Sequence, residues 1–442
     1  MQKTSFKILL FFLTILIIHY YPSVLEKIQP DSKGYMNFHQ TRQTSYFLIS
    51  QFLNILHVDI ITFQKVFLSF SITLLVLFIR KNTNTFLSLA SYLLIVSNVY
   101  YISFPKTILA ESIFFSLFNL AIVFFFYNEK KKNLIIFALI CGCLASLKPI
   151  GIPISLFLIL MSSIRIKKVS RILLIFVFFL IPSLLENFTF YSKFNERDTA
   201  FKMSVVGKLF LLSGKDSFII SKYPENLNEL LTKSKSEYRP IHIFLDSLDS
   251  TLLRSELLAD YEVVAQYQTF NFESIKQMNF DRKILFDNTN EIFFQILEHN
   301  FYDYLLLSFQ HYIGNWSIGS KVRLLKESKI EIPKYTELIK SSGPMNLPNL
   351  QLLELAQLFF LLLFFMVTII TILVIFSICR IIKYRVSYVD FSLISLLQIY
   401  LLLICLTNVS TPRYLMLVYP LIILINVRFV SLVKNKILKI NK

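Results

Sequence analysis

Charged side chains lie at or near the ends of several long apolar runs, where a membrane-bound enzyme would hold a charged substrate. They are Asp31, Arg42, Glu111, Lys148 and Arg413. Glu111 lies about one helical turn inside its apolar run, and a carboxylate in such a position is costly and is usually functional or paired. A carboxylate can take a proton from an attacking hydroxyl. Cations can bind a phosphate and stabilise the charge on a leaving group.

This combination suits the transfer of a sugar that is carried on a lipid phosphate. The phosphate of such a donor lies at the depth of the lipid headgroups, where Lys148, Arg413 and Arg42 would bind it. Asp31 would deprotonate the acceptor hydroxyl as that hydroxyl attacks the anomeric carbon. Glu111 could orient the acceptor or a cation. Because the phosphate already activates the donor, this chemistry needs no nucleotide site.

Each of these residues also has a simpler interpretation. Asp31 could be a helix cap or a turn residue. Glu111 could pair with Lys106 or with another buried cation. The cations at the ends of the apolar runs could be anchors that extend toward the membrane surface, and Arg42 could simply contact lipid headgroups.

The composition predicts an all-α polytopic membrane protein. The chain has 442 residues, of which 55% are hydrophobic and 45 are Phe, and its mean hydropathy is +0.59. A soluble protein of this length needs more polar surface. The net charge of +17 could suggest nucleic acid, but the cations form short clusters between apolar runs and no aromatic-basic recognition module is present. We therefore expect no nucleic-acid partner.

Several other classes of site lack their motifs. With 8 Gly, the chain has no GxGxxG and no Walker A loop, so nucleotide binding has no support. There is no HExxH, no zinc-ligand cluster and no GxSxG. The 4 Cys lie in or at the ends of apolar segments, so we expect no disulfide, and the histidines show no ligand spacing. We expect no cofactor, although Asp31 with Glu111 could hold one divalent ion.

The apolar runs predict about ten transmembrane helices. Their approximate limits are 5–22, 63–79, 86–104, 107–127, 134–148, 150–164, 171–188, 355–379, 388–407 and 413–433. The fifth and sixth runs are short and could instead form one hairpin that enters from one face. The first run is followed by no small-residue cleavage site, so it is interpreted as an uncleaved helix.

The distribution of cations predicts the orientation. Lys and Arg cluster in alternate connections, at 3–7, 80–81, 130–132, 165–171, 380–385 and 434–442. The short connections of the other set carry about one cation each, so the clustered set is expected on the cytoplasmic side. Both termini are then cytoplasmic, and the loops 23–62 and 189–354 face outward.

These limits divide the chain into three parts. Residues 1–188 form an N-terminal transmembrane module that contains the first outer loop, 23–62. Residues 189–354 are too many for a plain connector and are expected to form an outer domain, and residues 355–442 form the C-terminal helices. The stretches Tyr46–Leu56 and Glu291–Trp316 have helical spacing of apolar residues. They suit interfacial helices, and the second could instead pack against the bundle.

Several of these stretches resemble a known family. They are PDSKGY at 30–35, TRQTSYFLISQFL at 41–53, ILAESIFFSLFNLAIVFFF at 108–126, GCLASLKPIGIPI at 142–154 and RYLMLVYPLIILI at 413–425. In this order they resemble motifs of GT-C superfamily membrane glycosyltransferases, the bacterial relatives of protein O-mannosyltransferases and of the aminoarabinose transferases that modify lipid A. The resemblance covers about residues 1–190 and the last span.

The resemblance implies roles for individual residues. Asp31 would be the catalytic base, Lys148 and Arg413 would be candidate phosphate ligands, and Tyr35 and Tyr414 would accompany them. The chain departs from the pattern in three places. Asp31 is followed by Ser32 where many relatives have a second acid, the prolines around Arg42 are missing, and segment 189–354 matches no known domain.

The resulting hypothesis is an inverting glycosyltransferase of a bacterial cytoplasmic membrane. It would move a sugar from a β-linked polyprenyl-phosphate donor to a lipid, glycan or protein acceptor on the outer face. One alternative is an O-antigen-type polymerase or ligase that uses a diphosphate-linked donor. Another is a transporter or flippase, although such proteins usually place charges near mid-membrane in repeated halves. A catalytically inert scaffold is favoured if Asp31 is dispensable.

Overall fold

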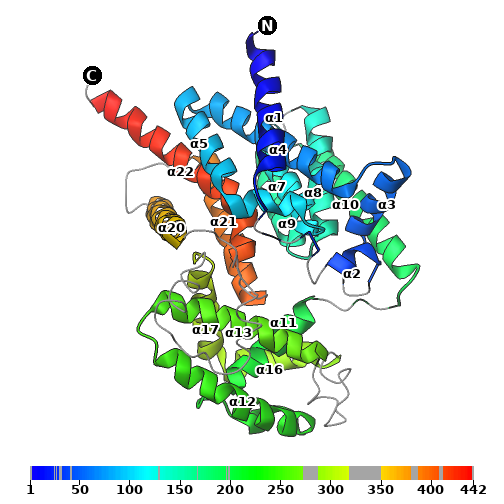
Figure 1. Cartoon of the computed structure of the whole chain (residues 1–442), viewed down its shortest axis with the longest axis vertical. Coiled ribbons are helices and arrows are strands. Elements are labelled where there is room, and N and C mark those ends of the chain that lie inside the picture. The colour runs from blue at the N-terminus through cyan, green and yellow to red at the C-terminus, as the bar shows by residue number, and fades with distance from the viewer. Residues whose placement is uncertain are drawn as a thin grey trace. The chain divides into compact units, whose positions relative to one another are not determined.

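The computed structural model describes most of the chain, and Figure 1 shows its path. The described residues are 2–23, 25, 27–28, 32–39, 42–127, 130–166, 168–195, 197, 200–271, 287–317, 350–379, 387–407 and 412–440. All regular secondary structure in these residues is helical. Contacts divide the chain into two compact units. The first comprises Met1–Asp198, Leu363–Tyr400 and Met416–Lys442, and the second comprises Thr199–Leu362 and Leu401–Leu415.

The described residues contain 6 helices that are long and apolar enough to cross a membrane. They are α4 (Ile60–Asn82), α7 (Ala110–Tyr127), α10 (Val169–Tyr191), α20 (Leu350–Ile378), α21 (Tyr388–Thr407) and α22 (Pro412–Ile440). The prediction of a polytopic helical membrane protein is thereby confirmed. Three further predicted spans correspond to helices outside these six, α1 (Gln2–Tyr20), α8 (Lys131–Leu147) and α9 (Gly151–Ile166). The number of ten spans stays a prediction.

The third predicted span, 86–104, is bent in the structure. Helices α5 (Thr85–Ser97) and α6 (Val99–Ser103), the latter continued by the 3-10 turn η1 (Phe104–Lys106), meet at 63°. Asn98 lies between them in an extended conformation, and its side chain accepts a hydrogen bond from the Tyr101 amide at 3.0 Å. Because Asn98 caps the start of α6, the chain begins a new helix there instead of continuing α5.

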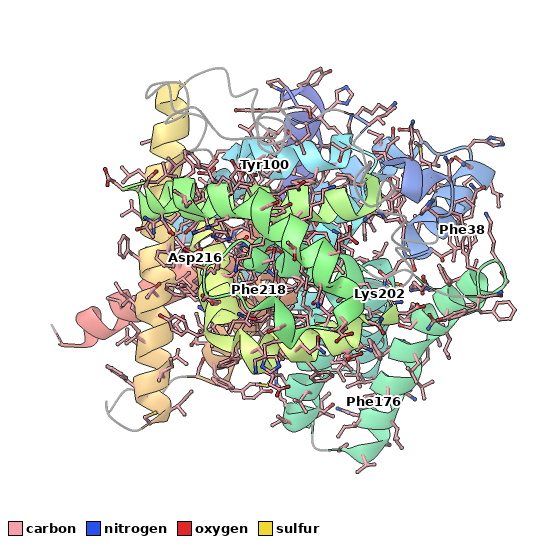
Figure 2. All side chains as sticks on the ribbon, turned by 90° about the horizontal axis from the view of Figure 1, so that it is seen from below. Phe38, Tyr100, Phe176, Lys202, Asp216 and Phe218 are labelled. Atoms are coloured by element: carbon pink, nitrogen blue, oxygen red, sulfur yellow. The ribbon has the colours of Figure 1, made fainter. Side chains whose placement is uncertain are left out.

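Helix α7 forms the centre of the first unit. In its apolar window 83% of the residues are buried, against 17% in α10, so α7 is enclosed by other helices while α10 lies at an edge. Helix α7 packs against α4 and α8, and α8 packs against α10. A Cβ atom at Gly142 of α8 would lie 2.4 Å from the Phe179 carbonyl oxygen, so glycine allows the close approach of α8 and α10. Phe176 lies on the exposed flank of α10 (Figure 2).

Two short helices follow α1 in the first loop. They are α2 (Ser32–Met36) and α3 (Ser45–Ile55), the latter matching the helix expected from Tyr46 to Leu56. Helix α3 packs against α4 and α8. In Figure 1, α2 lies at the end of the first unit away from the N-terminus. The first-loop helices therefore lie at one end of this unit.

The second unit has its own apolar core. Its helices are α11 (Ala200–Ser213), α12 (Asn228–Asp246), α13 (Thr251–Asn271), α16 (Thr289–His299) and α17 (Phe301–Gly314), with 3-10 turns η2 (Ile220–Lys222) and η3 (Glu225–Leu227). Helix α11 packs against α12, α13 and α16, and α13 packs against α17. Leu209, Leu231, Leu257 and Ile292 are fully buried between them. The predicted outer segment thus contains a packed helical core.

Candidate functional site

Glu111 and Lys148 form an ion pair in the first unit. The Lys148 Nζ atom lies 2.8 Å from Glu111 Oε1, and the two side chains retain 12% and 3% of their exposed surface. Glu111 lies in the first turn of α7, where the positive end of the helix dipole favours a carboxylate. The pair joins the start of α7 to the end of α8, and its cation keeps some access to the surroundings.

The start of α7 is fixed by hydrogen bonds from α4 and from the first loop. The side-chain amide of Gln64 donates to the carbonyl oxygens of Thr107 at 3.3 Å and Leu109 at 3.4 Å, and to the Tyr46 hydroxyl at 3.2 Å. The Ser32 hydroxyl donates to the Ile108 carbonyl oxygen at 2.8 Å. Because these bonds hold the three residues before α7, the direction of Glu111 depends on Gln64 and Ser32.

Lys148 lies in a tight turn between α8 and α9. It has an extended backbone (φ −150°, ψ 143°), and its carbonyl oxygen accepts a hydrogen bond from the Gly151 amide at 2.8 Å. A Cβ atom at Gly151 would lie 2.0 Å from the Leu144 carbonyl oxygen, so no other residue fits there without movement of the backbone. Pro149 has no amide to extend α8. The turn therefore places the Lys148 side chain beyond the end of α8.

The first loop adds two tyrosines and an arginine to this end of the unit. The rings of Tyr35 and Tyr46 are buried, with centroids 5.2 Å apart, and the Arg42 guanidinium lies 5.3 Å from the centroid of Tyr35. The Arg42 side chain passes directly over Gly34, where a Cβ atom would lie 3.1 Å from Arg42 Cγ. This stacking holds the guanidinium in place and contributes about 0.5–1 kcal/mol at an exposed site.

Glu186, near the end of α10, holds the same loop. Its Oε1 atom accepts from the Thr44 amide at 2.8 Å, and Arg197 Nη2 donates to both carboxylate oxygens at 2.8 and 2.9 Å. Phe38, which Figure 2 labels in this loop, has a φ of 51° and stacks on Phe47 at 5.1 Å. A non-glycine residue rarely adopts such a φ, so packing and the Glu186 clamp together define this loop conformation.

The Tyr46 hydroxyl is a neutral hydrogen-bonding group at this site. Burial raises the pKa of Tyr46 above its usual value of 10.0, the hydrogen bond from Gln64 acts in the opposite direction, and the Glu111 charge raises it further. The phenol therefore stays protonated at neutral pH. It can accept a hydrogen bond from Gln64 and donate one, but it cannot act as a phenolate base.

The predicted site residues have different outcomes. Four of them lie in the first unit: Glu111, Lys148, Arg42 and Tyr35. Hydrogen bonds from Ser32 and Gln64 connect the first loop and α4 to the backbone before α7. The Gln43 side-chain amide donates to the Ala145 carbonyl oxygen, near the end of α8, at 3.4 Å. Asp31 lies outside the described residues, as does the side chain of Arg413. Tyr414 is half-buried in the first turn of α22 and belongs to the second unit.

Sequence reasoning missed Glu186 and Gln64. Glu186 is an acid within a predicted span, which is a recognisable signal because such residues are rarely tolerated without a partner. Gln64 is an uncharged residue near the start of a span, and nothing in the local pattern marks it. Gln64 matters because its side-chain amide donates hydrogen bonds both to α3 and to the segment before α7. Only the packing of the helices brings these acceptors together.

A second charged cluster lies in the core of the second unit. Lys208 of α11 lies 2.9 Å from Glu262 of α13, and His311 Nε2 of α17 lies 3.0 Å from Glu262. His311 Nδ1 lies 3.4 Å from the Lys208 Nζ atom. All three side chains are fully buried. A neutral imidazole with its proton on Nε2 satisfies both neighbours, so the cluster connects three helices.

Burial shifts the ionisation of this cluster. It raises the pKa of the Glu262 carboxyl to about 7, an effect that the Lys208 charge opposes. It lowers the pKa of His311 well below 6.5, and the Lys208 charge lowers it further. Within the described residues, no group of three or more His, Cys, Asp or Glu side chains is placed to hold a metal ion. The possible divalent site of Asp31 with Glu111 stays a prediction.

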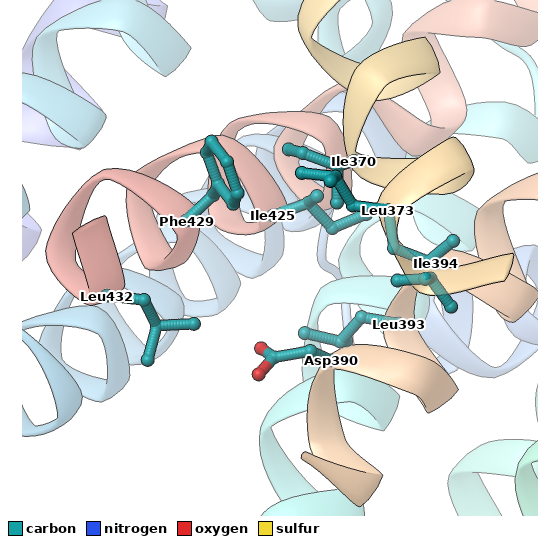
Figure 3. Close-up of a pocket in the computed structure, with 9 residues that line it drawn as sticks. Ile370, Leu373, Asp390, Leu393, Ile394, Ile425, Phe429 and Leu432 are labelled. Carbon is teal, nitrogen blue, oxygen red and sulfur yellow. The ribbon is translucent and has the colours of Figure 1, made fainter. Parts of the chain in front are cut away.

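A separate pocket of the first unit has a different character. Figure 3 shows it between α20, α21 and α22. It is lined by Asp390 and by the apolar residues Ile370, Leu373, Val374, Leu393, Ile394, Ile425, Phe429 and Leu432. The Asp390 carboxylate accepts from Arg428 Nε at 2.8 Å, so it is already neutralised. A lining of this kind does not suit a sugar phosphate.

No known protein family, no curated protein and no solved structure matches this chain. The resemblance to GT-C glycosyltransferases therefore rests on the local motifs alone. Chemically, the first-loop end of the first unit has a fixed carboxylate, two cations and two tyrosine side chains. Such groups can bind a phosphate and orient hydroxyl groups.

Proposed function

We propose that the protein is a glycosyltransferase of a bacterial cytoplasmic membrane. It transfers a sugar from a polyprenyl-phosphate donor to a lipid, glycan or protein acceptor on the outer face, with inversion at the anomeric carbon. In this proposal both termini are cytoplasmic and the first loop and the second unit face outward. The principal observation in its favour is the Glu111–Lys148 ion pair, at 2.8 Å, beside the first-loop helices.

Three properties of this region favour a phosphate ligand. Lys148 and Arg42 lie in non-helical connections, which the proposed topology puts on the outer side of the membrane, where the donor phosphate would lie. The Glu111 carboxylate holds the Lys148 ammonium in one position, and preorganised charges stabilise a transition state better than mobile ones. The nearby Tyr35 and Tyr46 rings are buried and pack against each other, so they give this end of the unit a fixed structure.

The proposed reaction is a single displacement. The acceptor hydroxyl oxygen forms a bond to the anomeric carbon from the face opposite the phosphate, and its proton passes to the Asp31 carboxylate. The bond between the anomeric carbon and the phosphate oxygen breaks, and its electron pair stays on the polyprenyl phosphate. Lys148 and Arg42 stabilise the resulting charge. Glu111 positions Lys148 through the ion pair.

Donor turnover by the purified protein tests this proposal. The full chain is reconstituted in lipid nanodiscs with labelled polyprenyl-monophosphate sugars, and the release of unglycosylated polyprenyl phosphate is measured. Asp31→Asn and Lys148→Met are each expected to lower the rate by about 100-fold or more. Lys106→Met is the matched control, because Lys106 lies in the same part of the unit but donates to the Tyr21 carbonyl oxygen and not to Glu111.

The outcomes separate the alternatives. Turnover that is equal in the wild type and Asp31→Asn removes Asp31 from the mechanism. Turnover restricted to diphosphate-linked donors favours a polymerase or ligase. Movement of intact donor between leaflets without cleavage favours a flippase, and an absence of both activities across a donor panel favours an inert scaffold.

A further inference from the structure

Helix α17 of the second unit has an apolar face that is partly exposed. Phe301, Tyr302, Leu305, Leu306 and Phe309 are between 36% and 77% exposed. At about 100° per residue they share one side of the helix. The buried side carries Tyr304, Leu307, Ser308, His311 and Gly314. The helix is thus apolar on two sides, and only one of these contributes to the core.

The remaining flank of α17 is polar. Asp303 accepts hydrogen bonds from Lys215 Nζ at 2.7 Å and from the Ser217 hydroxyl at 2.7 Å. Gln310 lies on the same flank, by helical spacing. Such a division between an apolar side and a polar side is the pattern of a helix that lies in a membrane interface.

Side-chain contacts within the second unit connect α17, and the residues directly after it, to the ends of two candidate membrane spans. The Tyr304 hydroxyl donates to the Leu406 carbonyl oxygen, and the Asn315 side-chain amide contacts the Cys405 sulfur at 3.4 Å. The Gln357 side-chain amide donates to the Trp316 carbonyl oxygen at 3.1 Å. Leu406 and Cys405 lie at the end of the span Tyr388–Leu406, and Gln357 lies at the start of the span Leu355–Ile378.

These contacts also determine the direction of α17. Tyr304 and Asn315 are separated by about 16 Å along a helix axis, yet they contact adjacent residues of α21. If α17 and α21 were parallel, the residues that they contact on each other would be separated by the same distance along both helices. Helix α17 therefore runs across the end of α21, in the direction that a membrane surface would have there.

A candidate membrane span of the same unit also exposes apolar side chains. Leu355, Leu358 and Leu362 of α20 are more than half exposed and belong to the same unit and to a candidate span. Since α17 is bonded to the end of that span, its exposed aromatic residues lie close to the same depth. We infer that α17 is an interfacial helix whose Phe301, Tyr302, Leu305 and Phe309 side chains insert into the lipid bilayer. This inference depends on the membrane-spanning helices and not on the proposed transferase activity.

Photo-crosslinking tests which partner covers this face. The photoreactive amino acid p-benzoylphenylalanine replaces Tyr302 or Phe309 in the full chain, one position at a time, in nanodiscs with one protein copy and in liposomes with many. Lipid adducts are counted by intact-protein mass spectrometry. The matched control is Ile243 of α12, which is 63% exposed in the same unit. Lipid adducts at Tyr302 and Phe309 are expected to exceed those at Ile243 by about tenfold.

Two results would overturn the inference. One is a yield of lipid adducts at both α17 positions no higher than at Ile243. The other is a crosslink between two copies of the chain in liposomes in place of lipid adducts, which would identify the face as a dimer interface. Both α17 side chains are exposed and are replaced by another aromatic group, and elution as a single species checks folding. A variant that misfolds at one position leaves the other as the test.

Discussion

The Glu111–Lys148 pair and the cluster of Lys208, Glu262 and His311 differ in their access to the surroundings. The Glu111–Lys148 pair keeps 12% exposure at its cation, whereas Lys208 and Glu262 are sealed at 1% and 0%, as is His311. The first cluster is formed by a helix start and a turn, the second by the interiors of three helices. A pair at chain turns can share its cation with a substrate, whereas a sealed cluster can only connect helices.

The largest expected effect is on the stability of the second unit. Lys208→Met removes the cation that pairs with Glu262 and leaves a buried carboxyl that must either keep an uncompensated charge or take up a proton, so we expect a loss of about 3–5 kcal/mol in the free energy of unfolding. Hydrogen exchange of α11, α13 and α17 in the full chain measures this loss. Lys222→Met, at an exposed lysine of the same unit, is the control and should cost less than about 0.5 kcal/mol. An equal, small effect of both would contradict a connecting role.

The same type of substitution in the first unit should affect activity. Lys148→Met is expected to lower donor turnover by about 10²–10³-fold, the effect of removing one preorganised donor from a developing negative charge. It also leaves Glu111 buried beside an apolar side chain, so the double variant Glu111→Gln/Lys148→Met is made in parallel. The double variant should recover thermal stability but not turnover. Recovery of turnover would show that the pair is structural, like the cluster of the second unit.

A smaller effect is expected where uncharged hydrogen bonds hold the site. Gln64→Leu removes the donor for Tyr46, Thr107 and Leu109 and should lower the stability of the first unit by about 1–3 kcal/mol. Gln51→Leu on α3 makes the same chemical change at an exposed position and serves as the control. Thermal unfolding in detergent compares the two. Equal melting temperatures would mean that packing alone holds the start of α7.

The smallest effect is the pH dependence of the sealed cluster. The pKa of Glu262 is raised from 4.5 to about 7, so its contribution to stability is full below pH 4.5 and is lost as the pH rises through about 7. The pKa of His311 is lowered below 6.5, so its contribution is present above pH 6.5 and is lost as the pH falls. Between pH 4.5 and 6.5 the two contributions offset each other.

Substitution of one member should expose the contribution of the other. In Glu262→Gln, the stability of the second unit is expected to fall by about 1.4 kcal/mol per pH unit below 6.5, relative to the wild type. Hydrogen exchange of α13 and α17 is measured between pH 5 and pH 7 and corrected for the intrinsic exchange rate. It gives the difference in stability between the variant and the wild type at each pH. Parallel curves for the variant and the wild type would show that the pKa of Glu262 is not raised in the folded protein, and a flat curve for the variant would show that His311 is not held neutral.

The sequence predicted helices well because long apolar runs allow few alternatives in a membrane. The bend at Asn98 was not predicted, since the run 86–104 is mostly apolar and a single capping side chain interrupts its helix. Short spans such as α8 and α9 are helical, but length and composition alone do not show whether each crosses the membrane. The helices are thus a local property of the sequence, while their bends and depths depend on neighbours.

The charged residues show the same limit. Glu111 and Lys148 were each identified because a charge within or beside an apolar run is conspicuous, but Lys106 was the first partner considered for Glu111. The actual partner depends on how α7 packs against α8. The cluster of Lys208, Glu262 and His311 has no local signal, because its members lie on three helices and each resembles a surface residue in sequence.

The close contact between α7 and α8 also has a consequence for synthesis. At about 5–20 residues per second, Lys148 leaves the ribosome roughly two to seven seconds after Glu111. Helix α7 therefore reaches the membrane with its carboxylate before the ammonium group that neutralises it has been made. Stable insertion of the central helix must wait for the turn at Pro149, so the two helices are expected to enter the bilayer as one hairpin.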